Sequence, residues 1–159
     1  SFTLLEYPQK PSYFITFFRH FVFILVLTNF VFMGTIGIHE FGHFAISKAY
    51  GCEERLIIYE EYPKTEALCS DESVKNLVLY GGFAPFLIAI ILAIIGGRFL
   101  REISLLITGF NLIACYKDFQ ELGFSDNIIF ALTLSGILLL IIGTSLLAKT
   151  KVEEQIMNP

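Results

Sequence analysis

The chain has 159 residues and a formal net charge of −4, and hydrophobic residues make up 55% of it while charged residues make up 16%. A soluble domain normally carries about 25% charged residues, so the composition excludes an ordinary soluble protein and predicts an integral membrane protein. The small net charge is spread over loops and indicates no nucleic-acid partner and no acidic substrate.

Four apolar segments follow one another along the chain. Their approximate bounds are 13 to 50, 74 to 97, 101 to 118 and 126 to 148. A helix needs roughly 20 apolar residues to cross the hydrocarbon core. The first segment is longer than this, so it tilts or begins at the membrane interface around Arg19 and His20. We expect an all-α integral membrane protein with about four transmembrane helices, in which residues 1–159 form a single membrane-embedded domain.

A polar stretch, 52–73, separates the first segment from the second. Within it, Leu56-Ile57-Ile58-Tyr59 and Thr65-Glu66-Ala67-Leu68 flank a turn-like centre and predict a short β-hairpin. Such a hairpin offers an edge that can pair with an extended peptide. Cys52 and Cys69 can face each other across it, but we expect free thiols if this loop is cytoplasmic.

The most specific pattern is His39-Glu40-Phe41-Gly42-His43 near the end of the first segment. Residues i and i+4 lie on the same face of a helix, so both imidazoles can bind one Zn²⁺. Glu40 is adjacent and can act as the general base of a hydrolytic reaction. Ionisable groups in an apolar segment are costly unless they are satisfied, which favours a metal site over an accidental match.

A catalytic zinc site commonly has a third protein ligand. If the hairpin lies on one side of the membrane, the second helix leaves that side and the third returns to it. The carboxylates that follow the third helix, Asp118 and Asp126, then come to the end of the bundle that holds the histidines. Both are candidate ligands.

These features resemble the site-2 protease family of intramembrane zinc metalloproteases, which pair a membrane-embedded H-E-x-x-H with a distant aspartate in an N-x-x-P-x-x-x-x-D-G motif. At the family's spacing, Asp126-Asn127 matches D-G, Asp118 stands where the family has Asn, and Glu121 stands where it has Pro. The segment Gly81-Gly82-Phe83-Ala84-Pro85 resembles the family's small-residue segment. The resemblance covers roughly residues 36–134, and within it only H-E-x-x-H is specific.

A second alignment places Asn111 and Asp118 on the same Asn-to-Asp motif with one residue missing. The gap-free alignment favours Asp126 as the third ligand, and Asp118 is its rival. Under the first alignment Asp118 lines the site in place of the family's Asn. This departure from the motif puts proteolytic activity in doubt more than it does metal binding.

The resemblance implies a zinc-dependent intramembrane endopeptidase that cleaves peptide bonds in or near transmembrane segments of a membrane-protein or peptide substrate. His39, His43 and Asp126 would hold Zn²⁺, with Glu40 as the catalytic residue. We expect a multi-pass protein in contact with membrane lipid, in the cell membrane, with its site toward the cytoplasmic side. Lysines and arginines at both ends of the segments do not by themselves fix that orientation.

Two other interpretations follow from the same residues. A non-catalytic relative would bind zinc and membrane proteins without cutting them, as the altered second motif allows. A small transporter would use the intramembrane histidines and glutamate to line a pathway.

Overall fold

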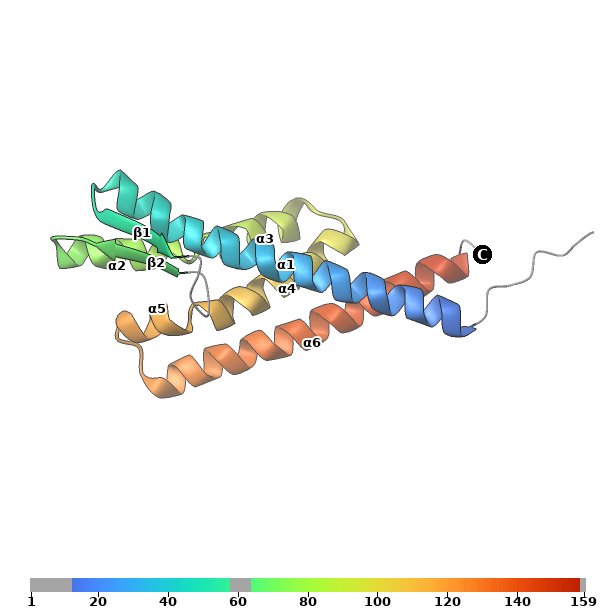
Figure 1. Cartoon of the computed structure of the whole chain (residues 1–159). Helices are drawn as coiled ribbons and strands as arrows, with labels where there is room; N and C mark the ends of the chain where they lie inside the picture. The colour runs from blue at the N-terminus through green and yellow to red at the C-terminus, as the bar shows by residue number, and fades with distance from the viewer. Residues whose placement is uncertain (1–12, 58–63, 158–159) are drawn as a thin grey trace, which may run out of the picture.

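The computed structural model describes residues 13–57 and 64–157, and it is a bundle of helices with one small hairpin (Figure 1). The elements in chain order are α1 (Tyr13–Ala49), β1 (Glu53–Ile57), β2 (Lys64–Leu68), α2 (Glu72–Gly81), α3 (Ala84–Ile95), α4 (Arg98–Ala114), α5 (Tyr116–Glu121) and α6 (Asp126–Met157). The start of α1 and the end of α6 lie at one end of the bundle, and the hairpin, α2 and α5 lie at the other.

Three helical stretches are long and apolar enough to cross a membrane: Tyr13–Ala49, Glu72–Ile95 and Asp126–Met157. They confirm the expected membrane-like, all-α character of the chain. The expected fourth span corresponds to α4, which has 17 residues and is not one of the three. The count of four spans therefore stays a prediction.

Helix α4 lies at the centre of the bundle, where it packs against α1, α3 and α6 (Figure 1). Close contact with α6 depends on small residues, since a Cβ on Gly109 would lie 2.8 Å from the carbonyl oxygen of Gly136. An apolar core then joins α1, α4 and α6, and its buried members are Val31, Ile103, Leu106 and Leu147. The centre of the bundle is therefore held by close backbone approach and by aliphatic packing.

Two of the expected spans are interrupted. The second is broken at Gly82 and Phe83 into α2 and α3, and Pro85 occupies the first turn of α3, where its missing N–H removes no helical hydrogen bond. The third ends at Ala114, and Cys115 separates it from the short helix α5. Both interruptions lie close to the candidate site described below.

The last helix extends beyond the expected end at residue 148, to Met157. Its additional turns are polar and carry paired charges: Lys149 lies 3.8 Å from Glu153, and Lys151 lies 2.8 Å from Glu154. Oppositely charged residues three or four positions apart stabilise a helix, so α6 continues where the apolar pattern stops.

The hairpin between α1 and α2 is antiparallel and pairs Glu53 with Leu68 and Ile57 with Lys64. A hairpin was expected here, although the predicted strand residues Ile58 and Tyr59 and most of the turn lie outside the described residues. The prediction of free thiols is wrong, because Cys52 and Cys69 form a disulfide at the base of the hairpin.

The end of α1 explains how Cys52 reaches Cys69. Gly51 has a φ of 72°, a left-handed conformation that glycine adopts without strain. Cys52 N–H donates to the carbonyl of Ser47, and Gly51 N–H donates to that of Lys48, which is the Schellman arrangement. The chain therefore reverses at Gly51, and the two cysteine Cα atoms lie 4.7 Å apart.

Helices α1 and α2 meet at a pair of glycines. A Cβ on Gly42 would lie 1.9 Å from the carbonyl oxygen of Gly81, and one on Gly81 would lie 2.4 Å from that of Gly42. Gly42 is the fourth residue of the H-E-x-x-H pattern, so the same short sequence provides both the histidines and the contact that positions α2 beside them.

We expect Gly42→Ala to destabilise the protein by about 1–3 kcal/mol, the usual cost of forcing extra atoms into a packed interface. Gly37→Ala is the matched control, because a Cβ there meets nothing within 4 Å and alanine is the better helix former. Thermal unfolding in detergent would measure both variants. Equal transition temperatures for the two would contradict the proposed role of the Gly42 contact.

Candidate metal centre

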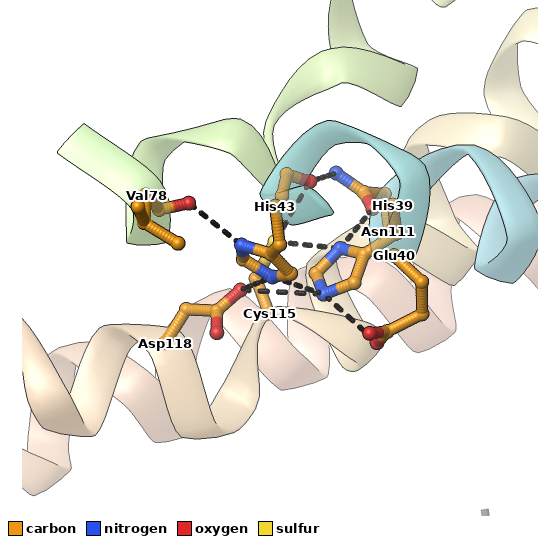
Figure 2. Close-up of polar contacts among 8 residues, drawn as sticks. His39, Glu40, His43, Val78, Asn111, Cys115 and Asp118 are labelled. Atoms are coloured by element: carbon orange, nitrogen blue, oxygen red, sulfur yellow. Dashed lines mark hydrogen bonds and ion pairs between the residues drawn. The ribbon is translucent and has the colours of Figure 1, made fainter. Parts of the chain in front are cut away.

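The side chains of His39, His43 and Asp118 converge in the interior of the protein (Figure 2). The two histidines lie one turn apart on α1 and are 4% and 6% exposed, and Asp118, from α5, is 8% exposed. The two Nε2 atoms are 3.2 Å apart. Asp118 Oδ2 lies 3.3 Å from each of them, so the three atoms form a nearly equilateral triangle.

These separations match those of ligands around one small metal ion. Tetrahedral zinc sites with bonds of about 2.0–2.1 Å hold their ligand atoms about 3.3–3.4 Å apart. Two imidazole nitrogens and one carboxylate oxygen are donors that suit Zn²⁺ and other first-row divalent ions. The group formed by His39, His43 and Asp118 could therefore bind a metal ion.

Hydrogen bonds on the far side of each imidazole direct Nε2 toward this point. His43 Nδ1 donates to the carbonyl oxygen of Val78 at 2.7 Å, and His39 Nδ1 bonds to Oδ1 of Asn111 at 3.0 Å. A neutral imidazole that donates through Nδ1 carries a lone pair on Nε2. Partners of this kind fix the tautomer and the ring orientation of metal-binding histidines.

The triangle is an unfavourable arrangement in the absence of a cation. Asp118 Oδ2 is buried and accepts no hydrogen bond from the described residues. It faces two nitrogens that, in this tautomer, also present lone pairs. Burying acceptor atoms against one another costs free energy unless a positive charge lies between them, so the donor set fits a metal cation.

Asn111 is a site residue that the sequence indicated only as the start of an alternative alignment. It is fully buried on α4, and its Nδ2 donates to the carbonyl oxygen of Gly82 at 3.1 Å. Since a carbonyl only accepts, this bond turns Oδ1 toward His39, which must then donate through Nδ1. An amide within an apolar segment is costly unless it is bonded, which is the signal that could have identified it.

Gly82 lies against the side chains of His39, His43 and Asp118. A Cβ at this position would lie 2.7 Å from Asp118 Oδ2 and from His39 Cε1, and 2.8 Å from His43 Cε1. A side chain here would displace the ligands, so the backbone itself forms this wall of the site. The small-residue segment noted in the sequence therefore has a structural role at the centre.

The break after α4 explains the position of Asp118. Helix α5 is anchored by Phe119, which is 5% exposed and packs in a cluster with Cys115 and Ile129. Its ring also contacts that of Phe83, with centroids 5.7 Å apart. With Cys115 and Phe119 fixed on either side of it along the chain, Asp118 is held toward α1.

Glu40 extends alongside the ligands (Figure 2). Its Oε1 lies 3.9 Å from His39 Nε2, and its side chain is 16% exposed. This places the carboxylate next to the ligand triangle without making it a member of the group. The position is that of a group able to exchange a proton with a water molecule at the centre.

The structure does not bring Asp126 to the histidines. Asp126 is the first residue of α6 and is exposed to solvent, whereas the rival ligand, Asp118, lies in the triangle. Asp126 was favoured because its alignment with the family motif needs no gap, and that spacing does not include the helix that forms between the two aspartates. Helix α5 occupies that segment and changes which carboxylate faces α1.

A cavity of about 670 Å³ opens beside the centre. His39, Glu40, His43 and Asp118 contribute to its wall, together with residues of α2 and α5. Ala67 and Leu68 of β2 and the adjoining Cys69 also line it. The centre is thus reached from a space between the hairpin and α5 that is large enough for several atoms of a ligand chain.

No family model matches this chain, and neither the curated proteins nor the solved structures include a match to it.

We expect Asp118→Asn to lose most of its bound metal, because a neutral amide replaces the anionic ligand. The effect should be at least the roughly 10–100-fold loss of affinity that follows removal of a histidine's hydrogen-bond partner. Asp126→Asn is the matched control and should retain metal as the unmodified chain does. Metal analysis of detergent-purified protein gives the answer, and a reversed result would identify Asp126 as the ligand.

Proposed function

We propose that this chain is an intramembrane zinc metalloprotease of the site-2 protease type. The observation that carries the proposal is the buried triangle of His39 Nε2, His43 Nε2 and Asp118 Oδ2, with the Glu40 carboxylate beside it. In zinc hydrolases, three protein ligands leave one position open and a nearby glutamate exchanges protons. In this proposal the three residues of the triangle are the metal ligands, and Glu40 is the glutamate that exchanges protons.

Zinc is the metal we propose for the centre. A bound Zn²⁺ supplies a Lewis acid that polarises a carbonyl and makes water more acidic. Glu40 accepts the proton of the attacking water and returns it to the leaving nitrogen as the peptide bond breaks. His39 and His43 are held in orientation by their Nδ1 hydrogen bonds to Asn111 and Val78.

The substrate we propose is a segment of a membrane protein in extended conformation. A helical substrate has its carbonyl groups in hydrogen bonds, so it must unwind before attack. The cavity beside the centre is bordered by Ala67 and Leu68 of β2, and the hairpin has two strands in its sheet. Pairing with a strand edge would satisfy the backbone of an unwound segment.

The geometry also favours the second alignment with the family motif. Asn111 and Asp118 both lie at the centre, which is what a motif that joins an asparagine to a metal-binding aspartate would require. We therefore propose Asp118, in place of Asp126, as the third ligand. Helix α4 is the fourth membrane span in this proposal.

The two other interpretations make different predictions about the same residues. A non-catalytic relative would retain zinc and cut nothing. A transporter would respond to His43→Ala with altered flux, because its histidines would line a pathway without holding a metal tightly. The buried triangle, with every ligand directed to one point, favours a tightly held ion.

We expect Glu40→Gln to lower cleavage of a model transmembrane substrate by about 10²–10⁴-fold, the usual contribution of a positioned general base. Bound zinc should be unchanged, since Glu40 is not one of the ligand group. The assay is cleavage in detergent or vesicles, with metal content measured on the same samples. The protease proposal would be contradicted if cleavage of the substrate survived Glu40→Gln, or if zinc-loaded unmodified protein did not cleave the substrate.

The disulfide bears on the orientation of the site. Cys69 borders the cavity beside the centre and is bonded to Cys52. Disulfides persist in oxidising compartments and are rare in the cytoplasm. We therefore propose that the site faces the non-cytoplasmic side of its membrane, opposite to the orientation expected from the sequence.

A membrane-impermeant maleimide tests this orientation in intact cells. We expect Cys52 and Cys69 to resist labelling until an impermeant reductant is added outside, and then to react. Cys115, which is fully buried, is the internal control and should stay unlabelled in the folded protein. Labelling that requires permeabilised cells would place the hairpin in the cytoplasm.

A further inference from the structure

We propose that a second site, far from the metal centre, binds the headgroup of an anionic phospholipid. A cavity of about 340 Å³ lies between the start of α1 and the end of α6. Arg19, His20 and Phe23 line it from α1, and Lys151, Glu154 and Gln155 line it from α6. None of these residues belongs to the metal centre or to the cavity beside it.

The position of this cavity matches the edge of a membrane. Residues 21–38 of α1 contain no ionisable side chain. At 1.5 Å per residue this segment is about 27 Å long, close to the roughly 30 Å of a hydrocarbon core. Arg19 and His20 stand just before the segment and His39 just after it. The cavity therefore lies at one end of this apolar segment, and His39 of the metal centre follows its other end.

The charges in the cavity are suited to a phosphate. Lys151 Nζ lies 5.0 Å from the centre of the Phe23 ring and 2.8 Å from Glu154, so its ammonium is held in place and partly compensated. Arg19 is exposed and forms no ion pair with another residue in the described ranges. Its planar guanidinium can bind a phosphate through two parallel hydrogen bonds.

The two helices that form the cavity are tied together by a hydrogen bond between His20 Nε2 and Gln155 Oε1. This bond joins residues 135 positions apart in the chain. It fixes the spacing of Arg19 and Lys151, which come from different helices. The cations are therefore pre-arranged on either side of one space.

A diacyl lipid accounts for the surroundings of the cavity better than a free anion does. On the core side of Arg19, the outward face of α1 is apolar and exposed, with Phe21, Leu25 and Val26 among its members. Acyl chains below a bound headgroup would lie along such a face. A basic pocket between membrane helices is a recurrent type of headgroup site.

Native mass spectrometry of the full-length chain tests the proposal. The protein is purified in detergent and mixed with equal amounts of phosphatidylglycerol and phosphatidylcholine. We expect preferential retention of phosphatidylglycerol, and about a fivefold loss of that preference in Arg19→Gln, as expected for one cation near a membrane surface. Glu154→Gln frees Lys151 and should increase the preference, which a merely damaged fold would not do.

Arg101→Gln is the matched control, because Arg101 is an exposed arginine on α4 that does not line the cavity. Its preference should equal that of the unmodified chain. Equal retention of both lipids, a preference that survives Arg19→Gln, or an equal loss in Arg101→Gln would overturn the proposal. Displacement of phosphatidylglycerol by the same concentration of inorganic phosphate would assign the cavity to a free anion instead of a lipid.

Discussion

Three acceptor atoms that face one another in a buried space are the constraint on which this structure depends. His39 Nε2, His43 Nε2 and Asp118 Oδ2 lie 3.2 to 3.3 Å apart, and mutual burial of lone pairs is unfavourable without a cation. The surrounding elements hold them there. Gly42 lets α2 approach α1, and Gly82 leaves room for the ligands. A cation at this point would therefore join α1 to α5 and add to the stability of the fold.

The interruptions of the second and third apolar segments have a common consequence. In an unbroken helix, each backbone carbonyl beside the centre would accept a hydrogen bond from the N–H four residues later and would not be free to bind a side chain. The break after α2 leaves the Gly82 carbonyl free to accept from Asn111, and the break after α4 turns Asp118 toward α1. Irregular backbone at membrane depth is tolerated where it is buried within protein. The two helix breaks thus position the Asp118 carboxylate and provide the carbonyl group that orients Asn111.

The sequence predicted the local parts of the site and missed those that depend on distant contacts. His39, Glu40 and His43 are related by the repeat of one helix, and the hairpin is signalled by its alternation and turn residues. The position of Asp118 depends on a helix break at Cys115 that neither glycine nor proline marks, so the gap-free spacing favoured Asp126 and left Asp118 as its rival. Asn111 lies in an apolar run whose pattern gives no sign of its partners. The disulfide was missed because Cys52 and Cys69 were expected to be free thiols on the assumption that the hairpin loop lies in the cytoplasm.

The cavity beside the centre reconciles a buried candidate metal site with the hydrolytic reaction that we propose for it. The histidines are almost fully buried, but Glu40 borders the cavity that opens between the hairpin and α5. Water can therefore reach the centre through the same opening that we propose for the substrate. The hairpin, fixed at its base by the disulfide, contributes Ala67 and Leu68 to the wall of this opening, so its position limits what can reach the centre.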